Sequence, residues 1–444
     1  MSHAPASPMI SPPKNSAGLR LSVMMFLQYA VWGLWLPIMA NYLGAPVEGG
    51  GLGFTGAQIG WILGLAGAIG AVAAPFIAGQ VADRYLNAER ALALLLLLGG
   101  VVKIILAKQT SYEAWLWLSI LYSVLYMPTL ALTNSIAFAN LDDPEKKFPP
   151  VRALGTIGWI VASVAFPVAW MMTDVKLVGY WPFIDGTKIA DSTHLIADAV
   201  TVSGIISIGY AVYCVLLLPK TPPKKDVAHP FAFAKAFRLF GRLDFTVLTL
   251  AALIISMIHQ CYFFRTGLYL ENAIGFDVAS VGPIMAIGQV SEILVLAVLG
   301  LFIKRLGYKW VLVLGTISYV LRYGLFGFVL SDETPSQGIV QAAMILHGFN
   351  YGCFFAGAFL YVEKIAPKDI SHSAQTVFGI IILGVGPVLA GFYNQYFDRY
   401  TDTTGSQQYH QFWYTQAGLA LIATVVILAL FRQAREAGNA EDTD

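Results

Sequence analysis

Twelve long apolar segments follow one another along this chain of 444 residues, and they limit its fold more than any other feature. A helix needs about 20 predominantly apolar residues to cross the hydrocarbon core of a bilayer. The segments of that length are 20–43, 56–82, 90–108, 112–140, 150–173, 197–218, 245–270, 278–303, 308–330, 338–362, 371–396 and 411–432. Lipid offers the backbone no hydrogen-bond partners, so each segment must be helical. The sequence therefore predicts an all-α integral membrane protein with twelve transmembrane helices.

The composition indicates a chain that lies in the lipid bilayer over its whole length. Only 12% of its residues are charged, whereas a soluble domain carries about 25%. The net charge of +1 would not attract nucleic acid, so we expect no nucleic-acid partner. Three cysteines, an odd number, cannot form a disulfide framework. No catalytic set and no His/Cys group with metal-ligand spacing is found, so we expect no enzymatic activity, no metal and no cofactor.

A proline-rich basic stretch, 219–244, divides the chain into two halves and has the composition of a linker. The expected parts are a flexible tail 1–19, a six-helix half 20–218, the linker 219–244, a six-helix half 245–432 and a tail 433–444. The inner loops of the halves also match, with Gly79 to Arg84 after the second span and Gly300 to Arg305 after the eighth. Two such halves suggest the parallel repeat of the major facilitator fold.

The distribution of Lys and Arg predicts the orientation of the chain. With the N-terminus inside, 20 of the 27 basic residues fall on the inner side, 4 on the outer side and 3 within spans. An excess of Lys and Arg in short loops marks the cytoplasmic side of a membrane, so both termini are expected in the cytoplasm. The major facilitator fold implies that the spans of Lys103 and Arg322 lie at the outside of the bundle, so we interpret both residues as packing or interface anchors. We interpret Arg265, six residues before Glu271, as part of an outer ion pair.

Glu292 lies near the middle of the span 278–303, with Gln289 one helical turn earlier on the same face. An ionisable group at that depth costs about 2.5 kcal/mol or more to insert. We therefore interpret Glu292 as part of a substrate or proton site. The alternative is a carboxylate that only ties two helices together through hydrogen bonds.

Several short stretches resemble one family, the bacterial nucleoside:proton symporters of the major facilitator superfamily. They are Phe26-Leu27-Gln28-Tyr29, Trp32-Gly33-Leu34-Trp35-Leu36, Tyr126-Met127-Pro128-Thr129-Leu130 with Asn134, Phe148-Pro149-Pro150-Val151-Arg152, Gly155-Thr156-Ile157-Gly158-Trp159, Gln289-Val290-Ser291-Glu292 and Ser373-Ala374-Gln375. The matches are collinear and touch both halves. The resemblance implies a monomeric secondary transporter in a bacterial inner membrane that imports nucleosides by alternating access, coupled to protons.

Other functions remain open. The chain could be an uncoupled facilitator, or a symporter for another polyhydroxylated solute such as a sugar. A non-transporting receptor or a membrane-embedded enzyme is disfavoured, because the sequence has no catalytic constellation and no domain outside the membrane.

Arg152, Thr156 and Trp159 stand on one face of the fifth span. A guanidinium, a hydroxyl and an indole on one stripe suit a ligand with hydroxyls and a flat ring, and the resemblance places these positions near the substrate. The alternative for Arg152, which is close to the inner surface, is a gate residue or a snorkelling side chain.

The resemblance assigns further substrate contacts to spans seven and eight. Gln260 matches a family contact, and Phe263 stands where the family can have a polar amide. Gln289 and Glu292 match the family's binding pair in type and spacing. A carboxylate can accept hydrogen bonds from two ribose hydroxyls.

Span ten carries the main departure from the family. Tyr351 is followed by Gly352, where the resembled stretch has an aspartate. Glu292 then remains as the candidate proton carrier, unless transport is uncoupled or the substrate has changed. His347 is a further candidate as a group that titrates near neutral pH, although a buried histidine can also be a purely structural hydrogen-bonding partner.

Gln28, Trp32 and Trp35 share a face of the first span and are candidates for lining a cavity. Trp32 and Trp35, like Trp159, Phe263 and Tyr351, could stack on a nucleobase, since every base has a π-face. Ordinary helix packing is the alternative for each ring.

Overall fold

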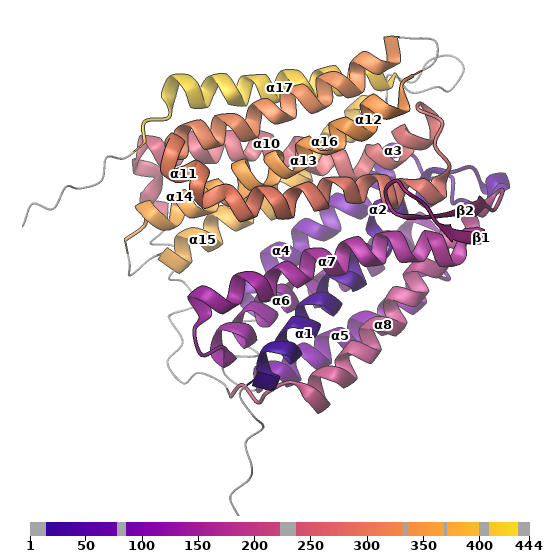
Figure 1. The fold of residues 1–444 in the computed structure, drawn as a ribbon, viewed down its shortest axis with the longest axis horizontal. Helices are drawn as coiled ribbons and strands as arrows, with labels where there is room; N and C mark the ends of the chain where they lie inside the picture. The colour runs from indigo at the N-terminus through magenta and orange to yellow at the C-terminus, as the bar shows by residue number, and fades with distance from the viewer. Residues whose placement is uncertain are drawn as a thin grey trace, which may run out of the picture.

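The computed structural model describes residues 15–77, 86–222, 237–331, 335–367, 371–398 and 408–433, and these residues are almost all helical (Figure 1). The helices of the first half are α1 (Asn15–Gly33), α2 (Leu36–Gly44), α3 (Gly56–Gly60), α4 (Ala66–Ile77), α5 (Ala88–Leu106), α6 (Tyr112–Asn140), α7 (Pro144–Trp170) and α8 (Ile196–Leu217). Those of the second half are α10 (Leu243–Asn272), α11 (Val278–Phe328), α12 (Gln337–Met344), α13 (Leu346–Phe349), α14 (Gly357–Ile365), α15 (Ser371–Ile380), α16 (Gly386–Phe397) and α17 (Tyr409–Leu430).

Three π-helical turns interrupt the α-helices in the part of the chain that the structure describes. They are η2 (Trp61–Leu65) between α3 and α4, η7 (Asn350–Ala356) between α13 and α14, and η8 (Ile381–Val385) between α15 and α16. Turns of this type occur frequently at functional sites.

The helices are consistent with twelve membrane spans. Ten stretches of the described residues are long and apolar enough to cross a bilayer. One of them, Val278–Ser331, contains two spans, because Gly307 breaks the helix with φ 78° and ψ 163°, which a glycine adopts readily. Helix α5 is the remaining span, and its Glu89, Arg90 and Lys103 make it more charged than the others. The predicted all-α membrane class is therefore confirmed.

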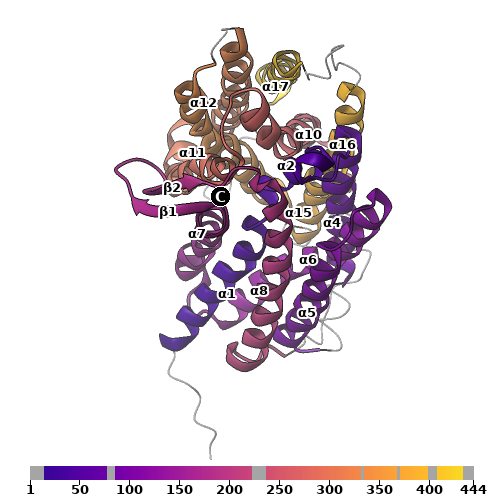
Figure 2. The same ribbon diagram turned by 90° about the vertical axis from the view of Figure 1, so that its right-hand side faces the viewer.

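Helices pack mainly with others from the same half. In the first half α1 contacts α7, α5 contacts α8, and α4 contacts α6; in the second, α10 and α11 both contact α17. The two groups lie side by side in Figures 1 and 2 and meet through α2 with α10, α3 with α16, and α7 with α11. Most of the expected linker, the outer parts of both expected tails and the loop from Gly79 to Arg84 lie outside the described residues.

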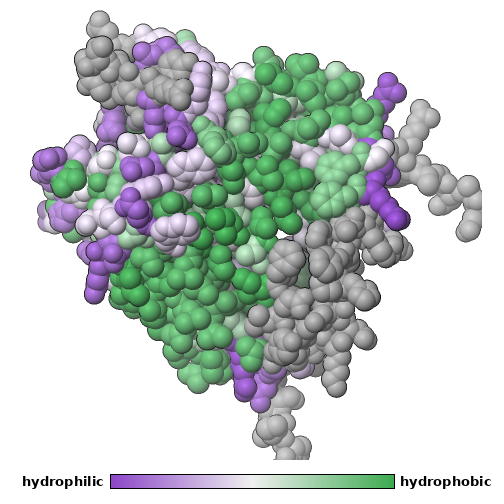
Figure 3. All heavy atoms as spheres, turned by 180° about the vertical axis from the view of Figure 1, so that it is seen from behind, coloured by the Kyte–Doolittle hydropathy of each residue, from purple (hydrophilic) through white to green (hydrophobic). Residues whose placement is uncertain are grey.

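Much of the surface is apolar. Figure 3 shows a broad hydrophobic face with hydrophilic residues toward its margins. Large apolar side chains of α5 and α17 are about half exposed, among them Leu94, Leu98, Ile422 and Val425. Exposed apolar area of this extent marks an interaction surface, which for helices of this length is lipid.

A β-hairpin follows α7 and was not predicted from the sequence. Strands β1 (Met172–Leu177) and β2 (Ile184–Lys188) pair antiparallel, with Met172 opposite Lys188. Trp181 donates a hydrogen bond from Nε1 to the carbonyl oxygen of Pro283 at 2.7 Å, which fixes the hairpin to the start of α11. We call the end of the bundle that carries this hairpin, α2 and α3 the hairpin end (Figure 1).

Hydrogen bonds within the hairpin make its stability depend on pH. The Tyr180 hydroxyl donates to Asp185 at 2.7 Å, and this bond, with the amide of Gly186 and the nearby Lys188, lowers the pKa of Asp185 below its ordinary 3.8. A lowered folded-state pKa stabilises the fold above the unfolded pKa, and this contribution is lost as pH falls through the folded pKa. At pH 6 we expect Asp185→Asn to speed amide exchange in residues 172–188 relative to the unmodified protein, measured by mass spectrometry. The difference should vanish at pH values well below 3.8, and a difference that persists there would contradict this role.

Candidate functional site

A cavity of about 360 Å³ lies between the two halves, a size typical of small-molecule sites. Helices α1, α5, α6 and α7 line one side, and α10 and α11 with the turns η7 and η8 line the other. The structure brings eleven of the twelve residues predicted from the sequence to its wall. They are Trp32, Trp35, Arg152, Thr156, Trp159, Gln260, Phe263, Gln289, Glu292, His347 and Tyr351.

Gln28 is the exception and does not line the cavity. Its fully buried side chain donates from Nε2 to Thr129 Oγ1 at 2.6 Å, and the backbone carbonyl oxygen of Gln28 accepts a hydrogen bond from the Tyr126 hydroxyl. Helical spacing places Gln28 on the face of Trp32, but that face turns from the cavity toward α6 within one turn. Gln28 therefore joins α1 to α6, and its predicted cavity-lining position is wrong.

Glu292 is the only carboxylate among the described residues that line the cavity. Arg152 lies close enough for the two charges to interact, but no direct ion pair joins them. Among the described residues the carboxylate also has no hydrogen-bond partner, so the structure gives no support to a helix-tying role. Arg152 itself lies 4.2 Å from the ring centroid of Tyr29. The carboxylate is thus held in the cavity and left free for a ligand or a proton.

Aromatic rings form the wall beside Arg152. The centroid of Trp32 lies 5.5 Å from that of Trp159 and 5.9 Å from that of Tyr126, both edge to face. Glycine makes this possible, because a Cβ at Gly33 would lie 2.7 Å from the carbonyl oxygen of Trp159. The close approach of α1 and α7 therefore fixes the indole of Trp159 at the cavity.

A histidine cluster lines the opposite wall, and part of it was missed from the sequence. His259 precedes the predicted Gln260, stacks on His347 at 5.5 Å and contacts the Tyr319 hydroxyl through Nδ1 at 2.7 Å. The signal that could have found it is a polar ring within an apolar span, directly beside a predicted contact.

The partner of His347 determines which tautomer it adopts. Arg322 Nη1 lies 2.8 Å from His347 Nδ1. A guanidinium can only donate, so Nδ1 must accept and the ring proton must be on Nε2. His347 is then a neutral ring that can donate a hydrogen bond to a ligand, and this geometry does not leave it free to carry a transported proton.

Arg322 and Lys103 lie inside the bundle and not at its outside, where they were expected. Arg322 is fully buried beside the histidines, and Lys103 lines the cavity with its Nζ 3.4 Å from the ring centroid of Trp35. Reading both as packing anchors missed these positions, although an ionisable residue within a span is by default a candidate for function. Arg265 does form an ion pair, but with Asp398, while Glu271 accepts a hydrogen bond from Asn41 at 2.5 Å.

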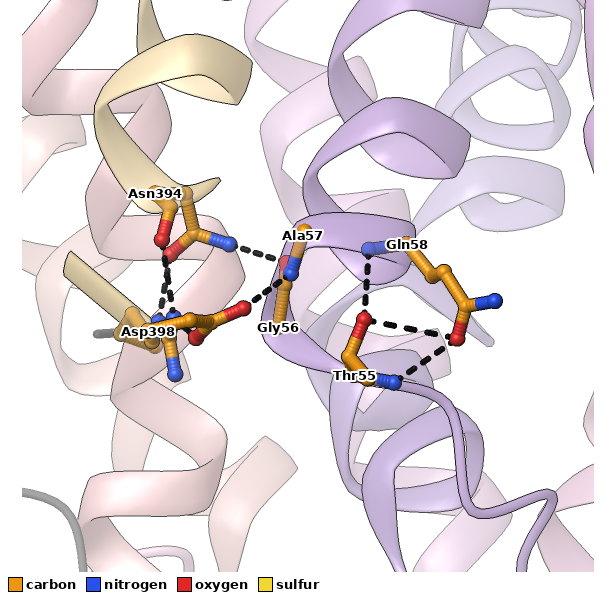
Figure 4. Close-up of polar contacts among 7 residues, drawn as sticks. Thr55, Gly56, Ala57, Gln58, Asn394 and Asp398 are labelled. Atoms are coloured by element: carbon orange, nitrogen blue, oxygen red, sulfur yellow. Dashed lines mark hydrogen bonds and ion pairs between the residues drawn. The ribbon is translucent and has the colours of Figure 1, made fainter. Parts of the chain in front are cut away.

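The Arg265 pair belongs to a network that joins the halves at the hairpin end (Figure 4). Arg265 of α10 donates to Asn394 of α16 and to Asp398, the residue that follows α16. Asp398 in turn accepts a hydrogen bond from the amide of Ala57, and the side-chain amide of Asn394 donates to the carbonyl of Gly56, both on α3. We call Arg265, Asn394, Asp398 and the first turn of α3 the clasp.

Gly352, where the resembled family has an aspartate, packs directly on α11. A Cβ at this position would lie 2.8 Å from Val295 Cγ1, well inside the roughly 3.5–4.0 Å at which carbon atoms pack. Val295 is itself buried. The position therefore has no room for an acidic side chain unless α11 moves.

This packing predicts the effect of filling the position. We expect Gly352→Ala to destabilise the protein by about 1–3 kcal/mol through overpacking, seen as a lower melting temperature in detergent. Val295→Ala should recover part of that loss, and a double-mutant cycle measures the coupling. Equal stability of Gly352→Ala and the unmodified protein, or purely additive effects, would refute the contact.

Comparisons with known proteins extend over most of the chain. The sequence model of the family described as "Nucleoside H+ symporter" matches residues 16–436. The chain is similar to "Putative nucleoside transporter YegT" of Escherichia coli (strain K12), at 32% identity over 379 residues that cover 83% of this chain and 82% of that protein. It is also similar to the xanthosine permease of that organism, at 28% identity over 433 residues, with 94% and 96% covered.

The chain is also similar in structure to a solved nucleoside transporter. The crystal structure of nucleoside transporter NupG superposes with a TM-score of 0.78 at 25% identity, covering 94% of this chain and all of that chain. The similarity therefore concerns the arrangement of all the helices and does not depend on one motif.

Proposed function

Because this chain belongs to the nucleoside H+ symporter family, we propose that it carries nucleosides into a bacterial cell together with protons. The observation that carries the proposal is Glu292, a carboxylate in a cavity between the two halves that has no direct ion-pair partner among the residues that the structure describes. Such a group can change its charge as the site is exposed to one side of the membrane and then to the other. Both termini are proposed to lie in the cytoplasm, which places the hairpin end outside.

In the proposed binding mode, the sugar and the base contact different side chains. Glu292 and Gln289, one helical turn apart, accept hydrogen bonds from the sugar hydroxyls. Thr156 and Arg152 contact polar atoms of the same ligand. Trp159 offers an aromatic surface to the base, which a nucleoside of any base could use.

The proposed cycle couples the charge of Glu292 to the position of the halves. Glu292 takes a proton from outside and becomes neutral, and the cavity then binds nucleoside. A neutral, loaded site crosses the closed state at lower cost than an ionised one. One half rocks against the other, the clasp closes the hairpin end, and the proton and nucleoside leave to the inside. The network of Arg265, Asn394 and Asp398 supports this order, because it joins the two halves at the hairpin end, which the cycle closes before release to the inside.

The experiment that tests the function is uptake of labelled uridine into proteoliposomes that contain the purified chain. We expect uptake to exceed equilibrium when the lumen is more alkaline than the medium, and to stop at equilibrium without the gradient. Hexoses should not compete with uridine. Uptake of a labelled hexose that unlabelled nucleosides do not inhibit would instead favour the sugar transporter.

A second function, uncoupled facilitated diffusion, is favoured by one observation. Gly352 stands where the family stretch has an acid, which leaves Glu292 as the single carboxylate among the described cavity residues. Uridine uptake that equilibrates without responding to the gradient would support this alternative.

A further inference from the structure

One corner of the cavity is rich in hydrogen-bond donors, and the proposed function leaves it unused. It consists of Lys103 of α5, Trp35 between α1 and α2, and Tyr122 and Ser123 of α6, all of which line the cavity. We call these four residues the Lys103 corner. Lys103 Nζ lies 3.4 Å from the ring centroid of Trp35 and 4.7 Å from that of Tyr122. Two aromatic faces therefore hold the ammonium group in place.

The polar atoms of this corner lack partners within the described part of the chain. Lys103 Nζ, Trp35 Nε1, the Tyr122 hydroxyl and Ser123 Oγ are all buried without a hydrogen bond. Buried polar groups in folded proteins are nearly always hydrogen-bonded, so four unpaired groups on residues that line the same cavity point to a missing ligand. The Lys103 ammonium and the Trp35 indole have donors only, so that ligand must supply acceptors.

The opposite wall has the reverse character. Glu292 and Gln289 of α11 both line it, and Gln289 Oε1 is an acceptor without a partner among the described residues. At these two places the cavity thus offers donors from the first half, at the Lys103 corner, and acceptors from the second half, at Glu292 and Gln289. A nucleoside has a matching polarity, because its sugar hydroxyls can donate and the oxo groups of some bases can only accept.

We propose that the Lys103 corner binds the exocyclic oxo group of the nucleobase while Glu292 and Gln289 hold the sugar, so that the transporter selects oxo-bases over amino-bases. An amino group at the same ring position is a donor, and it would face the donors of Lys103 and Trp35. A site built to pair with a substrate group discriminates strongly against an analogue that cannot form the bond. This inference rests on the proposed function and specifies its substrate class.

Two pairs of nucleosides test the selection directly. Uridine has an oxo group at the pyrimidine position where cytidine has an amino group, and inosine and adenosine differ in the same way in the purine. In each pair the neighbouring ring nitrogen also changes, while the sugar stays the same. Dissociation constants are measured by titration calorimetry on the purified full chain. We expect the oxo member of each pair to bind at least about tenfold more tightly, as a hydrogen bond to a charged group implies.

The variant Lys103→Met then identifies the residue responsible. It should bring both ratios close to one, mainly by weakening uridine and inosine. Lys108→Met, a matched change at an exposed lysine just beyond the end of α5, should leave both ratios unchanged. If Lys103→Met does not fold, Trp35→Phe decides, because it keeps an aromatic ring but loses the indole donor and should lower both ratios.

The outcomes separate the two proposals. Nucleosides that bind without oxo preference, or a preference that survives both Lys103→Met and Trp35→Phe, would overturn the role of the Lys103 corner and leave the proposed function standing. Failure of all four nucleosides to bind would overturn the proposed function itself.

Discussion

Glu292→Gln should abolish concentrative uptake while leaving the protein folded. Glutamine keeps the size of the side chain but cannot take up or release a proton, so the charge of the cavity no longer follows the pH on either side. In proteoliposomes with an alkaline lumen, we expect the accumulation ratio of labelled uridine to fall to one. Because the nucleoside binds to the neutral form of Glu292 in the proposed cycle, and the glutamine amide still offers an acceptor oxygen to the sugar hydroxyls, Glu292→Gln should continue to bind uridine.

A matched control separates this effect from a general loss of acid side chains. Glu113→Gln makes the same chemical change at an exposed position in the first turn of α6, and it should accumulate uridine normally. Exchange of labelled for unlabelled uridine across equal pH should continue in Glu292→Gln at high substrate concentration. Full gradient-driven accumulation by Glu292→Gln would show that another group carries the proton.

Asp398→Asn should release the clasp. Arg265 is only 1% exposed, and its charge is paired with Asp398. Breaking a fully buried ion pair costs about 3–5 kcal/mol, and we expect a smaller loss here because the Asp398 side chain is 21% exposed. The variant therefore destabilises the conformation in which the hairpin end is closed, so the fraction of molecules with an open hairpin end should increase.

Spin labels can measure that movement. Cysteines introduced at Glu48, in the loop between α2 and α3, and at Gln395, beside Asn394 in α16, would be exposed and would belong to opposite halves, whereas the three native cysteines are buried. We expect pulsed electron–electron resonance to show a longer distance between the labels in Asp398→Asn than in the parent. Asp277→Asn, at an exposed acid before α11, is the control and should leave the distance unchanged. An unaltered distance in Asp398→Asn would mean that the clasp does not hold the halves together.

The pattern of apolar residues was sufficient to predict the features of this protein that depend on local sequence. A run of apolar residues determines where a span lies, and an acid within that run, such as Glu292, is conspicuous because it is costly there. Spacing along one helix also placed Arg152, Thr156 and Trp159 on one face, and all three line the cavity. These predictions required no knowledge of which helices are neighbours.

Contacts between distant helices could not be predicted in the same way. Arg265 and Asp398 are 133 residues apart, and nothing in either span indicates that they meet. The prediction that Gln28 lines the cavity failed for a related reason. A helical face can turn toward a cavity or toward a neighbouring helix, and residue spacing does not distinguish these two cases. Lys103 was set aside because its span was expected at the outside of the bundle, whereas its side chain points inward to Trp35.

The three π-helical turns have a consequence for how such a bundle moves. Each contributes side chains to the cavity wall, as Leu63, Phe355 and Leu383 illustrate. A wider turn interrupts the regular hydrogen-bond ladder and is a common site of bending in a helix. Hinges at the depth of the ligand would let the ends of α4, α14 and α16 swing while the bound solute stays where it is. Opening and closing would then combine bending within single helices with the tilt of whole halves, and the ligand itself could stiffen the hinges that it touches.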